Sequence, residues 1–570
     1  MKPSQESDDN TDMGTVGLSF GSPTSGAGFD VTSTVNQIVT NMRAVETPWK
    51  NQLTTLQGQD TALTNVGTDL SSLSTAMQSL TDFEGVLSEK QGSSSDTNVL
   101  SLTSASTSAI GGSHTVVVQS LATTSSYVSA TITNASDTLS GSLVLNGKSI
   151  NIDSTNDTLS TLANAINSGN YGVTANVITD SSGSRLSLVS QTSGSSGAIS
   201  ITGGLEDSST SSAINFSQTQ PGSDAQLTVD GVSVTSASNT VTNAIQGVTF
   251  QLLSANPTEN VQVEITNNNS DVESALNTFV TDYNKVIQDL NTQEGNDSSG
   301  NPEPLFGDPT VALIQQALQS ALTFLQPANA AASSSVGASD TLSGSISISV
   351  GGGTAQSVTV PSGNQTLAGL AAAINGTPNI GVTASVITSG SSEVLSLTNG
   401  SGGSAGAISV DSSGLTDTTT SQAVTFGSAQ ASAITSITQL GISVNNDGTL
   451  ALNTDTLDSV LNSDYQDVVN FFQPSGSYTS FGGNFSSVLN NLGNSAPDGA
   501  VYLALQQNST VESQLNTNVS NEETIITAQQ TQLTTELNEA NFVLTEIPQQ
   551  LQQINEMYSA ITGYNENQNG

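Results

Sequence analysis

The residues best able to do chemistry are scarce in this chain, and none of them belongs to a set. His114 is the only histidine among 570 residues, and there is no cysteine. It lies in a predicted strand beside Val116 and Val118, with no second histidine to share a metal and no nucleophile to activate. We therefore expect His114 to be structural or solvent-facing, and we predict no catalytic residue.

Three short stretches could hold an ion or a phosphate by composition alone. Residues 295–303 (GNDSSGNPE) and 444–449 (VNNDGT) offer oxygen ligands, but neither has the spacing or the final glutamate of an EF-hand loop. The three glycines at 351–353 are not followed by the Gly-Lys-Ser/Thr of a phosphate-binding loop. The sequence therefore predicts no metal, no cofactor and no enzyme.

Charge excludes two further classes of partner. The chain has 7 Lys and Arg against 48 Asp and Glu, a formal net charge of −41, and no basic residue follows Lys285. Nucleic acids and anionic lipids are both bound through clustered basic side chains, so we expect neither. No run of 18 apolar residues occurs, which predicts no membrane insertion. The deficit of bases fits either a polar extracellular surface or an acidic habitat near about pH 4.

The remaining kind of interaction is association with other proteins through apolar side chains. Apolar residues suited to it repeat every seven positions near both ends of the chain. A repeat of seven keeps one apolar seam of a helix facing a partner helix, which is the signature of a coiled coil. Two such seams can find each other or find neighbouring subunits, which indicates a subunit of an assembly. The predicted interface consists of Val35, Ile38, Met42, Val45, Trp49, Leu56, Leu63, Leu70, Leu533, Leu537, Leu544, Ile547, Leu551, Ile554 and Ile561.

The seam helices are rich in Thr, Ser, Asn and Gln, which are middling to poor helix formers. We therefore expect residues 30–50 and 540–570 to be disordered in the free subunit and to become ordered on a larger assembly. The alternative is that the two ends pair within one chain as a stalk.

Two prolines fall inside the predicted terminal helices. Thr47 and Pro48 fit an N-cap followed by the first helical residue, which predicts a break or kink there, although the seam keeps its phase from Met42 to Trp49. Pro548 is a second candidate kink.

The middle of the chain contains a duplication. The octapeptide ASDTLSGS occurs at 135–142 and again at 338–345, and the sequences after both copies stay parallel, as in GVTANVIT at 172–179 and GVTASVIT at 381–388. Each copy predicts a strand pair, a short helix and further alternating strands. Two copies are too few for a solenoid, so we predict two compact β-rich modules.

These patterns predict an α+β multidomain protein, with long terminal coiled-coil helices forming a leg and several small β-rich head domains. Residues 1–20 also lack a basic segment followed by an apolar one, so we expect no secretory signal peptide. The predicted divisions are a disordered export segment at 1–28, N-terminal leg helices at 29–90, a β domain at 91–134 and 215–268, a β module at 135–214, a helical leg-proximal domain at 269–330 and 433–500, a second β module at 331–432, and a C-terminal leg helix at 501–570.

With these patterns laid out, the chain resembles the flagellar hook-associated protein 2 family, the filament cap proteins. No single match is strong, but the matches keep one order along most of the chain. They are the helix start Gly28–Val31, the step RAVETPW at 43–49, the strand at 112–122, FVTDYN at 279–284, the turn Leu305–Asp308, and LGISVNNDGTLAL at 440–452. The repeated modules resemble the insertion motif of flagellins and cap proteins, and the second module departs from the family pattern.

The resemblance implies a secreted structural protein at the distal tip of the flagellar filament. It implies a ring of about four to six subunits, with five favoured, that promotes insertion of exported flagellin and prevents its loss. The implied partners are other copies of the chain, flagellin, the hook–filament junction proteins and an export chaperone before secretion through the flagellar type III channel. Two alternatives stay open: a flagellin or hook–filament junction protein, and a surface adhesin, with adhesion also conceivable as a side activity of a cap.

Overall fold

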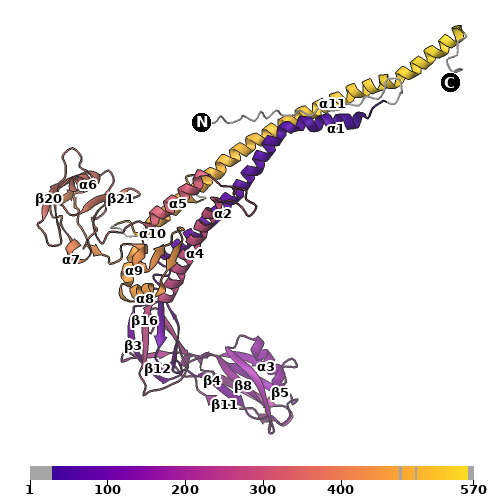
Figure 1. The fold of residues 1–570 in the computed structure, drawn as a ribbon. Helices are drawn as coiled ribbons and strands as arrows, with labels where there is room; N and C mark the ends of the chain where they lie inside the picture. Colours follow the sequence, from indigo (N-terminus) through magenta and orange to yellow (C-terminus); the bar gives the residue numbers. More distant parts are fainter. Residues whose placement is uncertain (1–27, 474–477, 494–496, 563–570) are drawn as a thin grey trace.

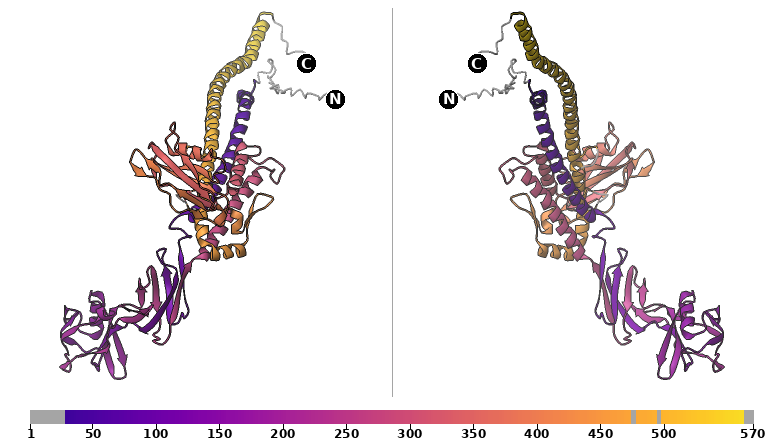
Figure 2. Two further views of the ribbon diagram at one scale, coloured as in Figure 1. Left: turned by 90° about the vertical axis from the view of Figure 1, so that its left-hand side faces the viewer. Right: turned by 90° about the vertical axis from the view of Figure 1, so that its right-hand side faces the viewer.

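The computed structural model describes residues 28–473, 478–493 and 497–562. The molecule is elongated (Figure 1): paired helices form one end, a helical body the middle, and two β units in series the other end, while a third β unit stands at the side of the body. Figure 2 gives the same arrangement from two other sides. The predicted α+β multidomain class is confirmed, whereas the export segment predicted at 1–28 lies, apart from Gly28, outside the described residues.

Three helices and a short 3₁₀ segment build the paired end. They are α1 (Val31–Met42), the 3₁₀ helix η1 (Arg43–Glu46), α2 (Thr47–Thr81) and α11 (Ala500–Thr562). Asp30 caps α1 by accepting a hydrogen bond from the Ser33 amide at 3.0 Å. The predicted break before Pro48 is present, but α2 begins at Thr47 with Glu46 in the cap position and no side-chain cap. α11 continues through Pro548 as one helix.

The helical body forms around one hydrophobic core. It combines the second half of α2 with α4 (Asn269–Gln293), α5 (Pro309–Leu322), α8 (Thr454–Ser463), α9 (Tyr465–Phe472), α10 (Phe481–Leu492), the start of α11, the 3₁₀ helix η3 (Ile437–Leu440) and the hairpin β27 (Ile442–Val444) and β28 (Leu450–Leu452). Residues 62–80, predicted as part of the N-terminal leg, therefore belong to this core.

The β domain next to the body has its own core, formed between two antiparallel sheets. One sheet has the order β1 (Lys90–Ser94), β16 (Val261–Asn267), β3 (Gly112–Ser120), β12 (Ala225–Val229) and β13 (Val232–Ser236). The other has the order β14 (Thr240–Thr242), β15 (Val248–Leu252) and β2 (Leu100–Ala105). The pair Asp230-Gly231, which in a sequence is typical of a hairpin turn, joins β12 to β13, and both residues have the positive φ that such a turn requires, +52° and +82°.

The first module closes a separate core between two four-stranded sheets and a helix. One sheet has the order β10 (Ser212–Ala213), β9 (Ile201–Asp207), β5 (Leu139–Leu145) and β6 (Lys148–Asn151). The other has the order β11 (Phe216–Gln220), β4 (Thr124–Ser129), β8 (Gly183–Ser193) and β7 (Val173–Asp180). The helix is α3 (Leu159–Ser168), and a 3₁₀ turn, η2, spans Ser195–Gly197.

The second module repeats this plan. Its elements are β17 (Asn329–Ala332), β18 (Val336–Gly337), β19 (Leu342–Val350), β20 (Gln356–Thr359), α6 (Leu367–Asn375), β21 (Thr383–Ser389), β22 (Ser392–Asn399), α7 (Gly403–Gly406), β23 (Ile408–Asp411), β24 (Leu415–Asp417), β25 (Gln422–Ala423) and β26 (Gln430–Ala431).

Atomic details recur between the two modules. The Asn167 side chain bonds both the amide and the carbonyl of Ala175 at 2.7 Å, and Asn375 does the same with Ala384 at 2.7 Å. The glycine of the repeated octapeptide (Gly141, Gly344) lies where a Cβ atom would overlap a backbone carbonyl of the neighbouring strand, so only glycine fits. The duplication seen in the sequence is therefore also a structural one.

Candidate functional site

The paired terminal helices bring part of the predicted seam together within a single chain. α1 lies along α11, where Val31, Val35, Val39 and Ile526 are buried, with Met42, Leu533 and Leu537 packed at their edges. The Phe29 amide donates to Asn541 Oδ1 at 2.8 Å, which fixes the start of α1 on α11. Residues 31–50 and 540–562 are helical in this chain, in contrast to the disorder expected for the free subunit, and residues 563–570 lie outside the described residues. α11 covers the apolar face of α1, which stabilises that helix.

Next to this contact, the 3₁₀ turn η1 changes which residues face the partner helix. Val45, predicted in the seam, is 55% exposed, whereas Glu46 is fully buried. A 3₁₀ helix turns by about 20° more per residue than an α-helix, so four residues rotate the apolar face away from the seam. The seam loses Val45 inside this turn, but the residues on either side of it, Met42 and Trp49, both pack in clusters with residues of α11, so the predicted phase from Met42 to Trp49 is kept.

Charged residues hold the chain at this bend, and sequence analysis missed them. Lys50 Nζ donates to Glu46 Oε2 at 2.6 Å, and Arg43 Nη2 donates to Glu523 Oε2 of α11 at 2.9 Å. Lys50 Nζ also lies 4.0 Å from Glu523 Oε1. The available signal was that two of only seven basic residues fall within one short segment beside the proline.

Beyond the bend, the seam continues as a smaller contact and then enters the body. Trp49, Leu53 and Leu56 pack against Val511 and Leu515 of α11. Leu63 and Leu70 are 1% exposed and face the body core rather than a leg partner.

The last part of α11 extends beyond α1 (Figure 1), and several of its apolar residues are exposed. Ile38, Leu544 and Ile547 are half-buried, but Leu551, Ile554 and Ile561 are 45%, 55% and 79% exposed. Exposed apolar residues that the predicted interface did not include occur in the same segment: Phe542, Val543, Met557 and Tyr558. This segment, residues 542–561 of α11, is called the distal face below. It is an apolar helix surface with no partner among the described residues.

The polar residues considered as candidate sites do not come together into a catalytic or metal-binding group among the described residues. His114 Nδ1 lies 2.8 Å from Asp230 Oδ2, and this hydrogen bond lowers the pKa of Asp230. Asp297 and Asp447 accept hydrogen bonds from backbone amides of their own loops, at 2.8 Å from Ser299 and 3.0 Å from Thr449. Within residues 28–473, 478–493 and 497–562, no group of three or more His, Cys, Asp or Glu side chains could hold a metal ion. No helix in the same residues is long and apolar enough to cross a membrane.

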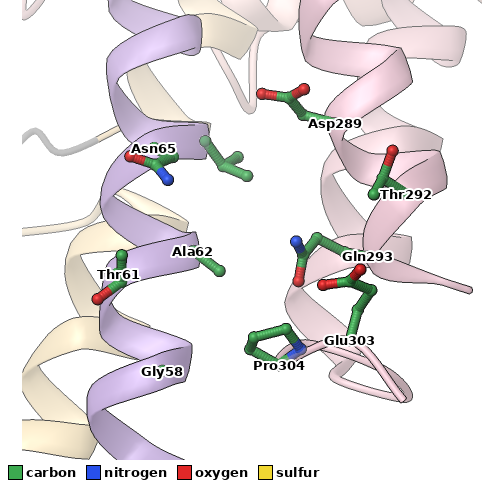
Figure 3. A pocket seen from close by; sticks show the side chains of 10 residues that line it. Gly58, Thr61, Ala62, Asn65, Asp289, Thr292, Gln293, Glu303 and Pro304 are labelled. Atoms are coloured by element: carbon green, nitrogen blue, oxygen red, sulfur yellow. The ribbon is translucent and has the colours of Figure 1, made fainter. Parts of the chain in front are cut away.

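A small pocket of about 300 Å³ lies between α2 and α4 (Figure 3). Gly58 and Ala62 create it, because their small side chains do not fill the space toward Gln293 and Pro304. It contains carboxyl, amide and hydroxyl groups but no nucleophile paired with a base, so it offers no catalytic arrangement.

Comparisons with known families cover most of the chain. The family described as "Flagellar hook-associated protein 2 C-terminus" matches residues 222–344 and 396–565, which is more than half of the chain. "Flagellar hook-associated protein 2 N-terminus" matches residues 27–125, and "Flagellin hook IN motif" matches residues 142–192 in the first module. The gap at 345–395 falls inside the second module, so this part of the module lies outside the match to the C-terminal family.

Individual relatives are similar over shorter stretches. The B-type flagellar hook-associated protein 2 of Pseudomonas aeruginosa is 28% identical over 253 residues, 38% of this chain and 53% of the relative. The flagellar hook-associated protein 2 of Salmonella typhimurium is 24% identical over 185 residues, 30% of this chain and 39% of the relative. The matches thus span about half the length of these relatives or less.

Among solved structures, the D1-D2-D3 domains of the flagellar cap protein FliD from Escherichia coli align with a TM-score of 0.48 at 21% identity, covering 79% of this chain and 99% of that one. FliD (HAP2) from Pseudomonas aeruginosa PAO1 aligns with a TM-score of 0.29 at 25% identity, covering 36% and 95%. The family is a structural part of the flagellum and not a family of enzymes. On the extent of the family match, the chain belongs to the flagellar hook-associated protein 2 family.

Proposed function

We propose that the protein caps the distal tip of the flagellar filament, where it promotes insertion and polymerisation of exported flagellin and prevents flagellin loss. Family membership supports this function, and the distal face carries it. Apolar side chains on a long helix, at the end of the molecule opposite the β domain, are suited to insertion between other helices. Catalysis has no part in such a role.

We further propose that the domains predicted from the sequence are separate structural units with separate roles. The separate hydrophobic cores support treating the body, the β domain and the two modules as distinct units, with the paired helices as the leg. The ring of about four to six copies, five being favoured, would place the β units outward. Flagellin, the hook–filament junction proteins and an export chaperone remain the proposed partners, together with secretion through the flagellar type III channel.

Imaging of native cells tests this function. Gold-conjugated antibody against the chain should give one spot at the distal tip of each filament. Label along the shaft would instead indicate a filament subunit, and label on the cell body with bare filaments would indicate an adhesin.

A secondary role in adhesion is proposed for the second module, and deleting it separates that role from capping. Two segments of the chain connect the module to the body, and a cleft of about 590 Å³ separates its β21–β22 hairpin from the body. Asn329 and Ala431, which lie where these two segments enter the module, are paired as strand partners. Removing residues 330–430 and joining these two residues through Asn-Gly therefore closes the chain with a hairpin turn, at the cost of the hydrogen bond that the Asn329 side chain donates to Ser401.

We expect the shortened chain to keep the thermal transition of its body and to cap filaments, because the body core contains no residue of the module. Calorimetry and a motility assay measure these two properties, and attachment to surfaces measures adhesion. Loss of the body transition would show that the module is part of the body's fold, and unchanged attachment would exclude adhesion through it.

A further inference from the structure

The interface between α2 and α4 contains three carboxyl groups and a single ammonium group. Asp69 comes from α2, and Asp282, Lys285 and Asp289 come from α4. Lys285 Nζ donates to Asp69 Oδ1 and lies 3.7 Å from Asp289 Oδ2. Lys285 is one of only seven basic residues, so this cluster keeps an excess of negative charge if every carboxyl is ionised.

Asp69 is the most enclosed member of the cluster. It is 4% exposed, and its Oδ2 atom has no hydrogen-bond partner among the described residues. A buried acceptor without a donor costs about 1–3 kcal/mol, and more if it is charged. Lys285 Nζ brings the two carboxyls together, because it donates to Asp69 Oδ1 and lies 3.7 Å from Asp289 Oδ2, and a proton on Asp289 would supply the donor that Asp69 Oδ2 lacks.

Other charged groups near the pair cannot supply that donor. Contact with Asp69, followed by burial, raises the pKa of Asp289, and burial raises the pKa of Asp282. The hydrogen bond to Asp69 raises the pKa of Lys285, which therefore stays charged but is shared among three carboxyls. Glu303 faces the neighbouring pocket together with Asp289 (Figure 3), and α10 and residues 500–508 of α11 contain no charged side chain.

We infer that Asp289 keeps a proton in the folded protein and donates it in a hydrogen bond to Asp69, so that the α2–α4 junction is more stable in acidic than in neutral solution. The sign follows from linkage: the folded state binds this proton more tightly than the unfolded chain does. The contribution of this proton to stability is therefore fully present at low pH. It begins to fall as the pH passes the ordinary pKa of 3.8, and it is lost once the pH exceeds the raised pKa of Asp289. If the protein caps filaments in acidic surroundings, its helical body would thus be more stable there than at neutral pH.

Asp289→Asn tests the proton on Asp289, because an asparagine amide donates a hydrogen bond to Asp69 at every pH. Amide hydrogen exchange of the full chain, corrected for intrinsic rates between pH 3 and 8, reports local opening of residues 280–293. In the wild type the opening constant should rise by up to about tenfold per pH unit within the titration range, since one proton is exchanged. In Asp289→Asn it should stay constant and, at pH 8, be lower than in the wild type.

Two controls make the outcome decisive. Glu273→Gln removes the same charge from the same helix outside the cluster and should behave as the wild type does. Peptides at 268–275 should keep their own pH dependence in Asp289→Asn, because Glu89 and Asp271 form a separate carboxyl contact that raises the pKa of Glu89. A wild-type profile that is flat, or Asp289→Asn with the wild-type profile, overturns the inference. So does protection at pH 8 that appears only when magnesium or calcium is added, because the cluster would then hold a cation.

Discussion

A chain carrying Leu551→Gln, Ile554→Gln and Ile561→Gln should fold normally and fail to cap filaments. The three side chains are 45–79% exposed in the single chain and belong to none of its hydrophobic cores, so replacing them removes little packing from it. Glutamine is a helix former comparable to leucine and better than isoleucine, so α11 should persist. The prediction thus separates the distal face's contribution to assembly from any contribution to folding.

The expected loss is large because docking would bury all three residues. Burial of a leucine or isoleucine side chain contributes about 1.5–3 kcal/mol, so three contribute about 5 kcal/mol or more. That corresponds to a loss of affinity of more than about a thousandfold. Cells expressing the variant should release monomeric flagellin into the medium and swim poorly, which immunoblotting of the medium and a motility assay would measure.

Trp49 supplies an internal check on folding. It is the only tryptophan, and it packs beside Leu53, Leu56 and Leu515 where α2 meets α11. Its fluorescence should be the same in the variant and the wild type. Gln550→Ala, Gln553→Ala and Asn555→Ala, which alter exposed polar residues of the same segment and leave the apolar face intact, should cap normally. If this control also failed to cap, or if the glutamine variant capped normally, the distal face would not be the docking surface.

Local patterns allowed much of this fold to be predicted from the sequence. The duplicated octapeptide marked two modules because its glycine and the later Ala-Ile-Asn segment have backbone roles that allow little substitution, as Gly141 and Asn167 illustrate. Turns such as Asp230-Gly231 were predictable because few residues accept positive φ. These features depend on residues that are close together in the chain.

The candidate site was less predictable, because a heptad pattern shows that a helix has an apolar face but not what covers it. Leu63 and Ile561 both occupy positions of a seven-residue repeat, yet their surroundings differ. Leu63 lies in the body core, whereas Ile561 is exposed because α1 begins opposite Asn541. The burial of Glu46 in place of Val45 depended on a 3₁₀ turn that hydrophobic spacing does not encode. Such outcomes are decided by where the partner helix ends and by local helix geometry.

The second large effect should come from the body, whose core contains a cluster of phenylalanines. Phe481 is fully buried at the start of α10 and stacks on Phe471 with ring centroids 4.7 Å apart, while Phe472 and Phe485 lie 6.0 and 5.6 Å away. Phe481→Ala should destabilise the body by about 3–5 kcal/mol, because it removes a large buried ring and leaves a cavity that the neighbouring rings cannot fill.

Calorimetry of the full chain should show the body transition shifted to lower temperature, while the separate β cores of the modules keep theirs, because those cores share no residue with the body. Tyr283→Phe is the matched control in the same core. The Tyr283 hydroxyl is buried and has no hydrogen-bond partner among the described residues, so its removal should cost no stability. A loss from Tyr283→Phe as large as that from Phe481→Ala would mean that the hydroxyl is bonded in solution. An unshifted body transition in Phe481→Ala would mean that the rest of the core holds the body together without this aromatic cluster.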